Sequence, residues 1–113
     1  MHEALADHLR RHALRTGDFV LRSGARSLWY VDARAPTFSG EGAALVADAV
    51  LGALLPAATA VGGPAQGADP IAVAAALVGA SRGRPRKAFS VRPRPKAHGT
   101  GGRRVEPWQR PRN

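Results

Sequence analysis

The first third of the chain mixes apolar and charged residues in a pattern that predicts a helix and then two short strands. Leu and Ala recur at helical spacing over about residues 3–15, with His and Arg between them. Gly17 is expected to cap the end of this helix. Strand-like runs at residues 19–21 and 27–32 flank a turn signal at Ser23-Gly24. We therefore expect an amphipathic helix followed by a hairpin or small hood.

The middle of the chain predicts a second helix and a short strand. Leu, Val and Ala recur on one face over residues 40–55, which is typical of a helix packed against a core. Ser39 is a suitable N-cap, and Pro56 ends the pattern. Residues 58–61 then predict a buried strand that runs into Gly62-Gly63-Pro64.

A third helix and a further strand complete a recognisable unit. The helix is predicted over residues 69–81, with Asp69 as its cap and Pro70 at its first position. Residues 87–91 predict another buried strand. Strand, glycine turn, helix and strand form a βαβ unit, so we expect an α/β domain with a parallel sheet. From Arg92 onward, frequent Pro and Gly argue against any regular element.

Composition limits what this fold can bury. Apolar residues make up 44% of the 113 residues, but much of this share is Ala, so the core is expected to be shallow. The absence of Cys excludes disulfides and thiolate metal sites. The N-terminus lacks a signal-peptide pattern, and Asp48 and Pro56 interrupt the longest apolar stretch, residues 43–61. We expect a cytoplasmic protein with no membrane segment.

The charge is concentrated at one end of the chain. The net charge is +9, yet residues 1–81 carry six Arg and seven acids, whereas residues 82–113 carry eleven Lys or Arg and one acid. A basic segment rich in Pro and Gly, with few large apolar residues, is typical of a mobile tail. We therefore expect a folded part over residues 1–92 and a flexible basic loop and tail over residues 93–113.

Two segments offer groups suited to ligand binding. At the hairpin, backbone polar groups lie beside aromatic residues, which suits a flat polar heterocycle. The alternative is a solvent-facing hairpin with a buried Trp. At residues 61–70, a glycine-rich turn that opens a helix offers free N–H groups and the positive end of the helix dipole to a phosphate. The alternative is a tight turn that needs small residues.

A third segment, residues 92–104, combines fixed cations, glycines and His98. Such a loop could close over a phosphorylated substrate and stabilise the charge that develops on a leaving pyrophosphate. The alternative is a disordered basic tail that binds polyanions weakly.

In order and spacing, these segments resemble the orotate phosphoribosyltransferase family. The family has a stretch like Phe19-Val20-Leu21-Arg22-Ser23-Gly24, followed by Ser-x-aromatic-aromatic-x-Asp. It also has a Gly-Gly-Pro-x-x-Gly-Ala-Asp-Pro turn and an Arg-Lys-x-x-Lys-x-His-Gly loop. The resemblance runs from about Leu5 to Val105. It implies an α/β, type I phosphoribosyltransferase fold, here truncated, with an N-terminal hood and an incomplete parallel sheet.

The resemblance also implies a reaction and its residues. Orotate and 5-phosphoribosyl 1-diphosphate, with Mg²⁺, would give orotidine 5′-phosphate and pyrophosphate in pyrimidine biosynthesis, on a homodimer. Tyr30 and Val31 match backbone positions that hold orotate. Lys96 and His98 match catalytic residues of a loop that, in the family, reaches into the neighbouring subunit's site. The positions implied to bind the phosphoribosyl diphosphate are Arg22, Ala65, Gln66, Gly67, Arg92, Lys96 and His98.

The chain departs from the family pattern in two places. Pro93 stands where the family usually has Lys, so one cation is missing. The family also continues into an acidic pair and a Thr/Gly-rich turn that hold the ribose and its phosphate, whereas Glu106 is the only acid after Asp69 here. The sequence therefore predicts an N-terminal part of the enzyme with very low or no activity by itself.

Two other hypotheses stay open at this point. The chain could be a non-enzymatic basic module that binds nucleic acid or other polyanions. Nucleic acid is disfavoured because Trp108 is the tail's only aromatic residue for stacking and no nucleic-acid motif is present. The chain could also be a remnant that pairs with an intact paralogue and lends it the loop.

Overall fold

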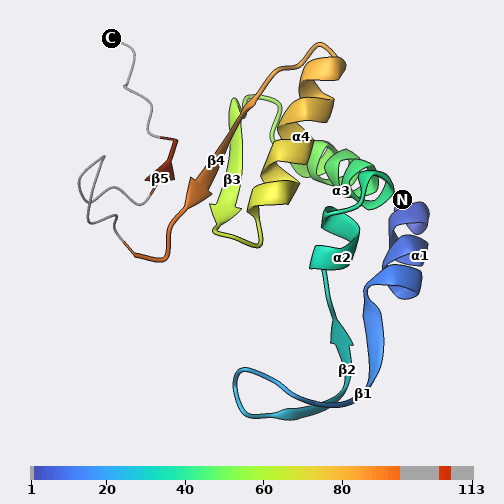
Figure 1. The fold of residues 1–113 in the computed structure, drawn as a ribbon. Helices are drawn as coiled ribbons and strands as arrows, with labels where there is room; N and C mark the ends of the chain where they lie inside the picture. Colours follow the sequence, from blue (N-terminus) through green and yellow to red (C-terminus); the bar gives the residue numbers. More distant parts are fainter. Residues whose placement is uncertain (1, 95–104, 108–113) are drawn as a thin grey trace.

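The computed structural model describes residues 2–94 and 105–107. Figure 1 shows a mixed α/β body from which a long hairpin projects. Along the chain the elements are α1 (Glu3–His12), β1 (Leu14–Val20), β2 (Arg26–Val31), α2 (Arg34–Thr37), α3 (Gly40–Ala53), β3 (Ala60–Pro64), α4 (Asp69–Ser81), β4 (Lys87–Val91) and β5 (Val105–Glu106).

The predicted hairpin is confirmed. Strands β1 and β2 are antiparallel, from Leu14 opposite Val31 to Val20 opposite Arg26. Gly24 lies in the turn with φ at 90°, a backbone conformation that favours glycine. The hood expected from the sequence is therefore present, although it stands away from the body.

The predicted first helix is too long. Helix α1 ends at His12, and Gly17 lies within β1 instead of capping the helix. From Leu14 onward the backbone pairs with β2, and the Asp32 N–H donates to the Ala13 carbonyl at 2.8 Å. The helical spacing of apolar residues continues past His12, but pairing with β2 determines the backbone conformation from Leu14 onward.

The predicted βαβ unit is confirmed. Strands β3 and β4 are parallel neighbours, from Ala60 opposite Lys87 to Pro64 opposite Val91, and α4 connects them. Strand β3 begins later than predicted and includes the glycine pair. Its residues are alternately exposed and half-buried, so the expectation of a buried strand was wrong. The reason is that β3 is an edge strand of its sheet.

A short strand follows where none was expected. Strand β5 pairs antiparallel with β4, with Ser90 opposite Glu106 and Val91 opposite Val105. The sheet order is therefore β3–β4–β5, and β4 is central. Two residues are too few to carry a periodic pattern, so only pairing with β4 reveals this strand.

Helices α3 and α4 largely follow their predicted courses. The Ser39 side chain accepts a hydrogen bond from the Gly42 N–H at 3.0 Å, which confirms the predicted N-cap of α3. Helix α4 begins at Asp69, but Ala68 is its N-cap and no side chain caps it, so the predicted role of Asp69 was wrong. The chain enters α4 through the turn itself, which leaves Pro70 at the second helical position.

The core is shallow, as expected, and consists mainly of alanine. The buried apolar residues in the described part of the chain are Pro36 and the alanines Ala13, Ala47, Ala72 and Ala75. Large apolar side chains remain exposed, for example Leu77 on α4, which is 70% exposed. The helices within the described ranges lack the length and apolar character needed to cross a bilayer.

Close approach of α2 and α3 depends on Gly42. The one-turn helix α2 was not predicted, and it packs against the start of α3. A Cβ atom on Gly42 would collide with the Pro36 carbonyl oxygen and would lie 2.7 Å from His8 Nε2. Alanine therefore has no room at this position.

The substitution Gly42→Ala is expected to lower the free energy of unfolding by about 1–3 kcal/mol, because the added methyl group overpacks this contact. Gly52→Ala is the matched control on the same helix, since a Cβ there meets no atom within 4 Å. It is expected to raise the free energy of unfolding by about 0.5–1 kcal/mol. Thermal and urea unfolding followed by circular dichroism measures both. Equal effects of the two substitutions would contradict the steric account.

Candidate functional site

The glycine-rich turn begins at the carboxyl end of β3, beside the end of β4. Pro64 pairs with Val91, and the Ala65 N–H donates to the Val91 carbonyl at 2.8 Å. A Cβ on Gly62 would collide with Phe89, and a Cβ on Gly63 would lie 2.9 Å from the Ala68 Cβ. Small residues are thus required for packing at this turn, which agrees with the alternative that the sequence left open, a tight turn that needs small residues.

The same turn also presents unused hydrogen-bond donors. The Ala68 N–H donates to Pro64 and the Asp69 N–H to Gln66, each at 3.1 Å. Within residues 2–94 and 105–107, the N–H groups of Gln66 and Gly67 donate to no backbone acceptor, and both residues are exposed. The turn leads directly into α4, whose N-terminus carries partial positive charge. This arrangement can bind an anion.

Arg92 lies immediately after β4, close to the turn. Its Nη1 is 3.4 Å from Glu106 Oε1, in a part-buried pair that joins the ends of β4 and β5. The turn and the start of the cationic segment therefore share one edge of the sheet, where the hydrogen bond from Ala65 to Val91 joins them. Lys96 and His98 lie outside the described residues.

The hairpin forms a second group of predicted site residues. Arg22 and Tyr30 line a cavity of about 470 Å³ together with Phe19, whose ring centroid is 5.9 Å from that of Tyr30. Val31 is 44% exposed at the end of β2. The strands of the hairpin are mostly exposed, as the alternative of a solvent-facing hairpin expected, but its buried Trp was wrong, because Trp29 is 59% exposed.

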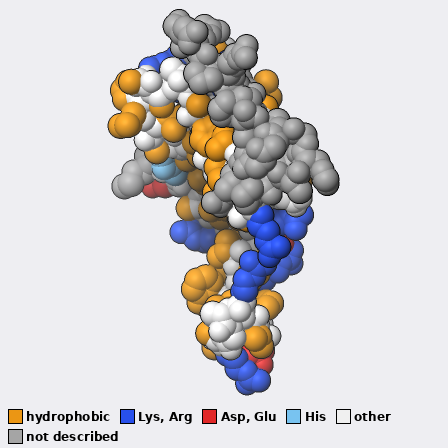
Figure 2. Space-filling view, turned by 90° about the vertical axis from the view of Figure 1, so that its left-hand side faces the viewer, with side chains coloured by type: hydrophobic (Ala, Val, Ile, Leu, Met, Phe, Trp, Pro, Cys, Tyr) orange, Lys and Arg blue, Asp and Glu red, His pale blue; other side chains and the backbone are white. Residues whose placement is uncertain are grey.

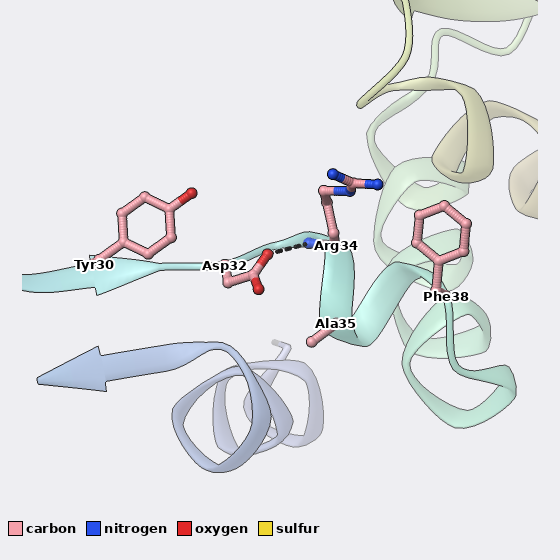
Figure 3. Close-up of a pocket in the computed structure, with 5 residues that line it drawn as sticks. All are labelled: Tyr30, Asp32, Arg34, Ala35 and Phe38. Carbon is pink, nitrogen blue, oxygen red and sulfur yellow. Dashed lines mark hydrogen bonds between the residues drawn. The ribbon is translucent and has the colours of Figure 1, made fainter. Parts of the chain in front are cut away.

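Another cavity lies where the hairpin joins α2, and the sequence did not indicate it. Its volume is about 510 Å³, and it is lined by Tyr30, Asp32, Arg34, Ala35 and Phe38 (Figure 3). Sequence reasoning missed Arg34 and Phe38 because it assigned no element to residues 34–37. The sequence did contain one signal: Arg34 and Phe38 are four residues apart, a spacing that places two side chains next to each other on a helix.

The two groups of residues occupy different parts of the molecule. Figure 1 shows the carboxyl ends of β3 and β4 pointing toward the end of the molecule from which the hairpin projects. On the face in Figure 2, Lys and Arg side chains gather between the body and the hairpin. The described side chains contain no group of three or more His, Asp or Glu that could hold a metal ion.

Curated relatives share this sequence pattern over most of the chain. No family model matches the chain. It is 42% identical over 107 residues to an orotate phosphoribosyltransferase of Thermosynechococcus vestitus, and the alignment covers 88% of this chain and 57% of the relative. The enzyme of the same name from Streptomyces avermitilis is 42% identical over 104 residues, covering 91% of this chain and 57% of the relative. The chain spans about half the length of these relatives.

Solved structures agree with the sequence comparison. An orotate phosphoribosyltransferase from Mycobacterium tuberculosis, in complex with Fe(III) dicitrate, has a TM-score of 0.73 and 36% identity, covering 93% of this chain and 58% of its own. The structure of the same enzyme in complex with 5-phospho-α-D-ribosyl 1-diphosphate has a TM-score of 0.62 and 34% identity. The match covers 80% of this chain and 52% of that enzyme's chain. The expected α/β phosphoribosyltransferase fold is therefore confirmed. In sequence and in fold, this chain matches the N-terminal part of the orotate phosphoribosyltransferases.

Proposed function

We propose that this chain forms the N-terminal part of an orotate phosphoribosyltransferase, an enzyme of pyrimidine biosynthesis in the cytoplasm. The reaction joins orotate to 5-phosphoribosyl 1-diphosphate and releases pyrophosphate, giving orotidine 5′-phosphate. The observation that carries the proposal is the hydrogen bond from the Ala65 N–H to the Val91 carbonyl, 2.8 Å long. It holds the turn, which we propose binds an anion, beside Arg92.

The turn and Arg92 are proposed to hold the diphosphate. The N–H groups of Gln66 and Gly67 are available within the described residues, and the N-terminus of α4 adds partial positive charge. Arg92 supplies a fixed cation at the same edge of the sheet. As the bond to the ribose breaks, negative charge grows on the leaving pyrophosphate, and donors already in position stabilise it.

The hairpin is proposed to bind orotate through the backbone at Tyr30 and Val31, with Arg22 toward the phosphoribosyl diphosphate. Tyr30 lines two cavities, one with Arg22 and Phe19 and the other with Arg34 and Phe38, so a heterocycle could reach it from either. Lys96 and His98 are proposed to close over the site, in a homodimer from the neighbouring subunit. Mg²⁺ is proposed to arrive with the diphosphate.

Ligand binding by the whole chain tests the proposal. Calorimetric titration in the presence of Mg²⁺ compares 5-phosphoribosyl 1-diphosphate with ribose 5-phosphate, which lacks the diphosphate. The diphosphate compound is expected to bind at least about tenfold more tightly, because the turn and Arg92 recognise the group that only it carries. Equal affinities for the two compounds, or binding of neither, would refute the proposal.

The pair of Arg92 and Glu106 provides a second prediction, in which substituting either partner has a different effect on affinity. Arg92→Gln is expected to weaken binding of inorganic pyrophosphate by about tenfold, because a charge-assisted hydrogen bond is lost. Glu106→Gln removes the carboxylate that competes for the Arg92 guanidinium, so the affinity should stay the same or rise. Titration calorimetry measures both. A similar loss of affinity in the two variants would mean that the pair acts only as a structural link between β4 and β5.

A further inference from the structure

We propose that Arg34 binds the carboxylate of the pyrimidine substrate, in the cavity where the hairpin joins α2. The inference rests on the proposed function and adds a residue that determines specificity. The cavity has a volume of about 510 Å³, within the range of small-molecule sites. Tyr30, one of the two positions proposed to hold orotate, is part of its lining.

The charge of Arg34 is available to a ligand. Asp32 is the neighbouring acid, but its Oδ1 accepts a hydrogen bond from the Arg34 backbone N–H at 3.2 Å, and its Oδ2 is 3.9 Å from Arg15 Nη2. Figure 3 shows the Asp32 carboxylate on the opposite side of the chain from the Arg34 guanidinium and the Tyr30 hydroxyl. The acid is thus directed away from the side chain of Arg34.

The remaining lining suits a flat ring. Phe38 is 71% exposed and is 5.8 Å, measured to its ring centroid, from the Arg34 guanidinium carbon. Tyr30 contributes a second aromatic face and a hydroxyl that can donate or accept a hydrogen bond. Aromatic faces beside a guanidinium match a planar heterocycle that carries one carboxylate, because the guanidinium fork binds a carboxylate through two parallel hydrogen bonds.

A phosphate ligand fits this cavity less well. Arg34 is the one basic residue in its lining, so a dianion or trianion would meet a single fixed cation there. The turn at Gln66 and Gly67, with Arg92, already offers several donors to a diphosphate. A single guanidinium matches a single carboxylate. The structural alternative is that Arg34 and Phe38, four residues apart, only stabilise the short α2.

Comparing orotate with uracil isolates the carboxylate, because orotate is uracil that bears a carboxylate on its ring. The full chain is titrated with each compound, as wild type and as Arg34→Gln. The wild type is expected to prefer orotate, and Arg34→Gln to weaken orotate binding by about tenfold while uracil binding changes by less than about twofold. Arg34→Lys keeps the positive charge but loses the forked guanidinium, so its affinity for orotate should lie between those of the wild type and Arg34→Gln.

Arg84→Gln is the matched control, since Arg84 is an exposed arginine in the connection between α4 and β4. It should leave both affinities unchanged. Circular dichroism checks that each variant is folded. Equal weakening of orotate and uracil by Arg34→Gln, or no weakening of orotate, would overturn the inference. A wild type that binds 5-phosphoribosyl 1-diphosphate but does not prefer orotate over uracil overturns the inference alone, whereas a wild type that binds neither substrate overturns the proposed function as well.

Discussion

The parallel pairing of β3 and β4 is the constraint on which the rest of the molecule depends. The last pair of its register, Pro64 opposite Val91, is extended by the hydrogen bond from the Ala65 N–H to the Val91 carbonyl. This brings two segments that are far apart in the sequence to one edge of the sheet. On one side is a turn whose Gln66 and Gly67 N–H groups donate to no backbone acceptor among the described residues, and on the other is Arg92. The donors of a phosphate site need this proximity before they can act on one anion.

Small residues make this arrangement possible and also limit its stability. Gly62 permits β3 to lie against Phe89, and Gly42 permits α3 to approach α2. Apart from Pro36, the buried apolar side chains in the described part of the chain are alanines, which remove little apolar area from water. Val73 and Leu77 on α4 remain largely exposed. Close backbone packing is thus obtained with little burial of apolar area, so steric fit at a few glycines matters more than the amount of hydrophobic surface buried.

Electrostatics divides the candidate site into two regions of different character. At the sheet edge, backbone donors and Arg92 favour an anion with several oxygens. At the base of the hairpin, two aromatic rings and one arginine line an open cavity. The two regions suit a diphosphate and a planar carboxylate respectively, which are the two reactants of the proposed reaction.

The sequence by itself determined the features that depend on nearest neighbours along the chain. The hairpin turn at Gly24, the Ser39 cap and the strand–turn–helix–strand order were all predictable, because short-range geometry and periodicity specify them. Tertiary structure alone decided where α1 ends, the existence of β5, the pairing of Arg92 with Glu106 and the cavity beside Arg34. Each of these arises when separate segments meet, and hydrogen bonds or cavities between distant residues leave no periodic signal in either segment.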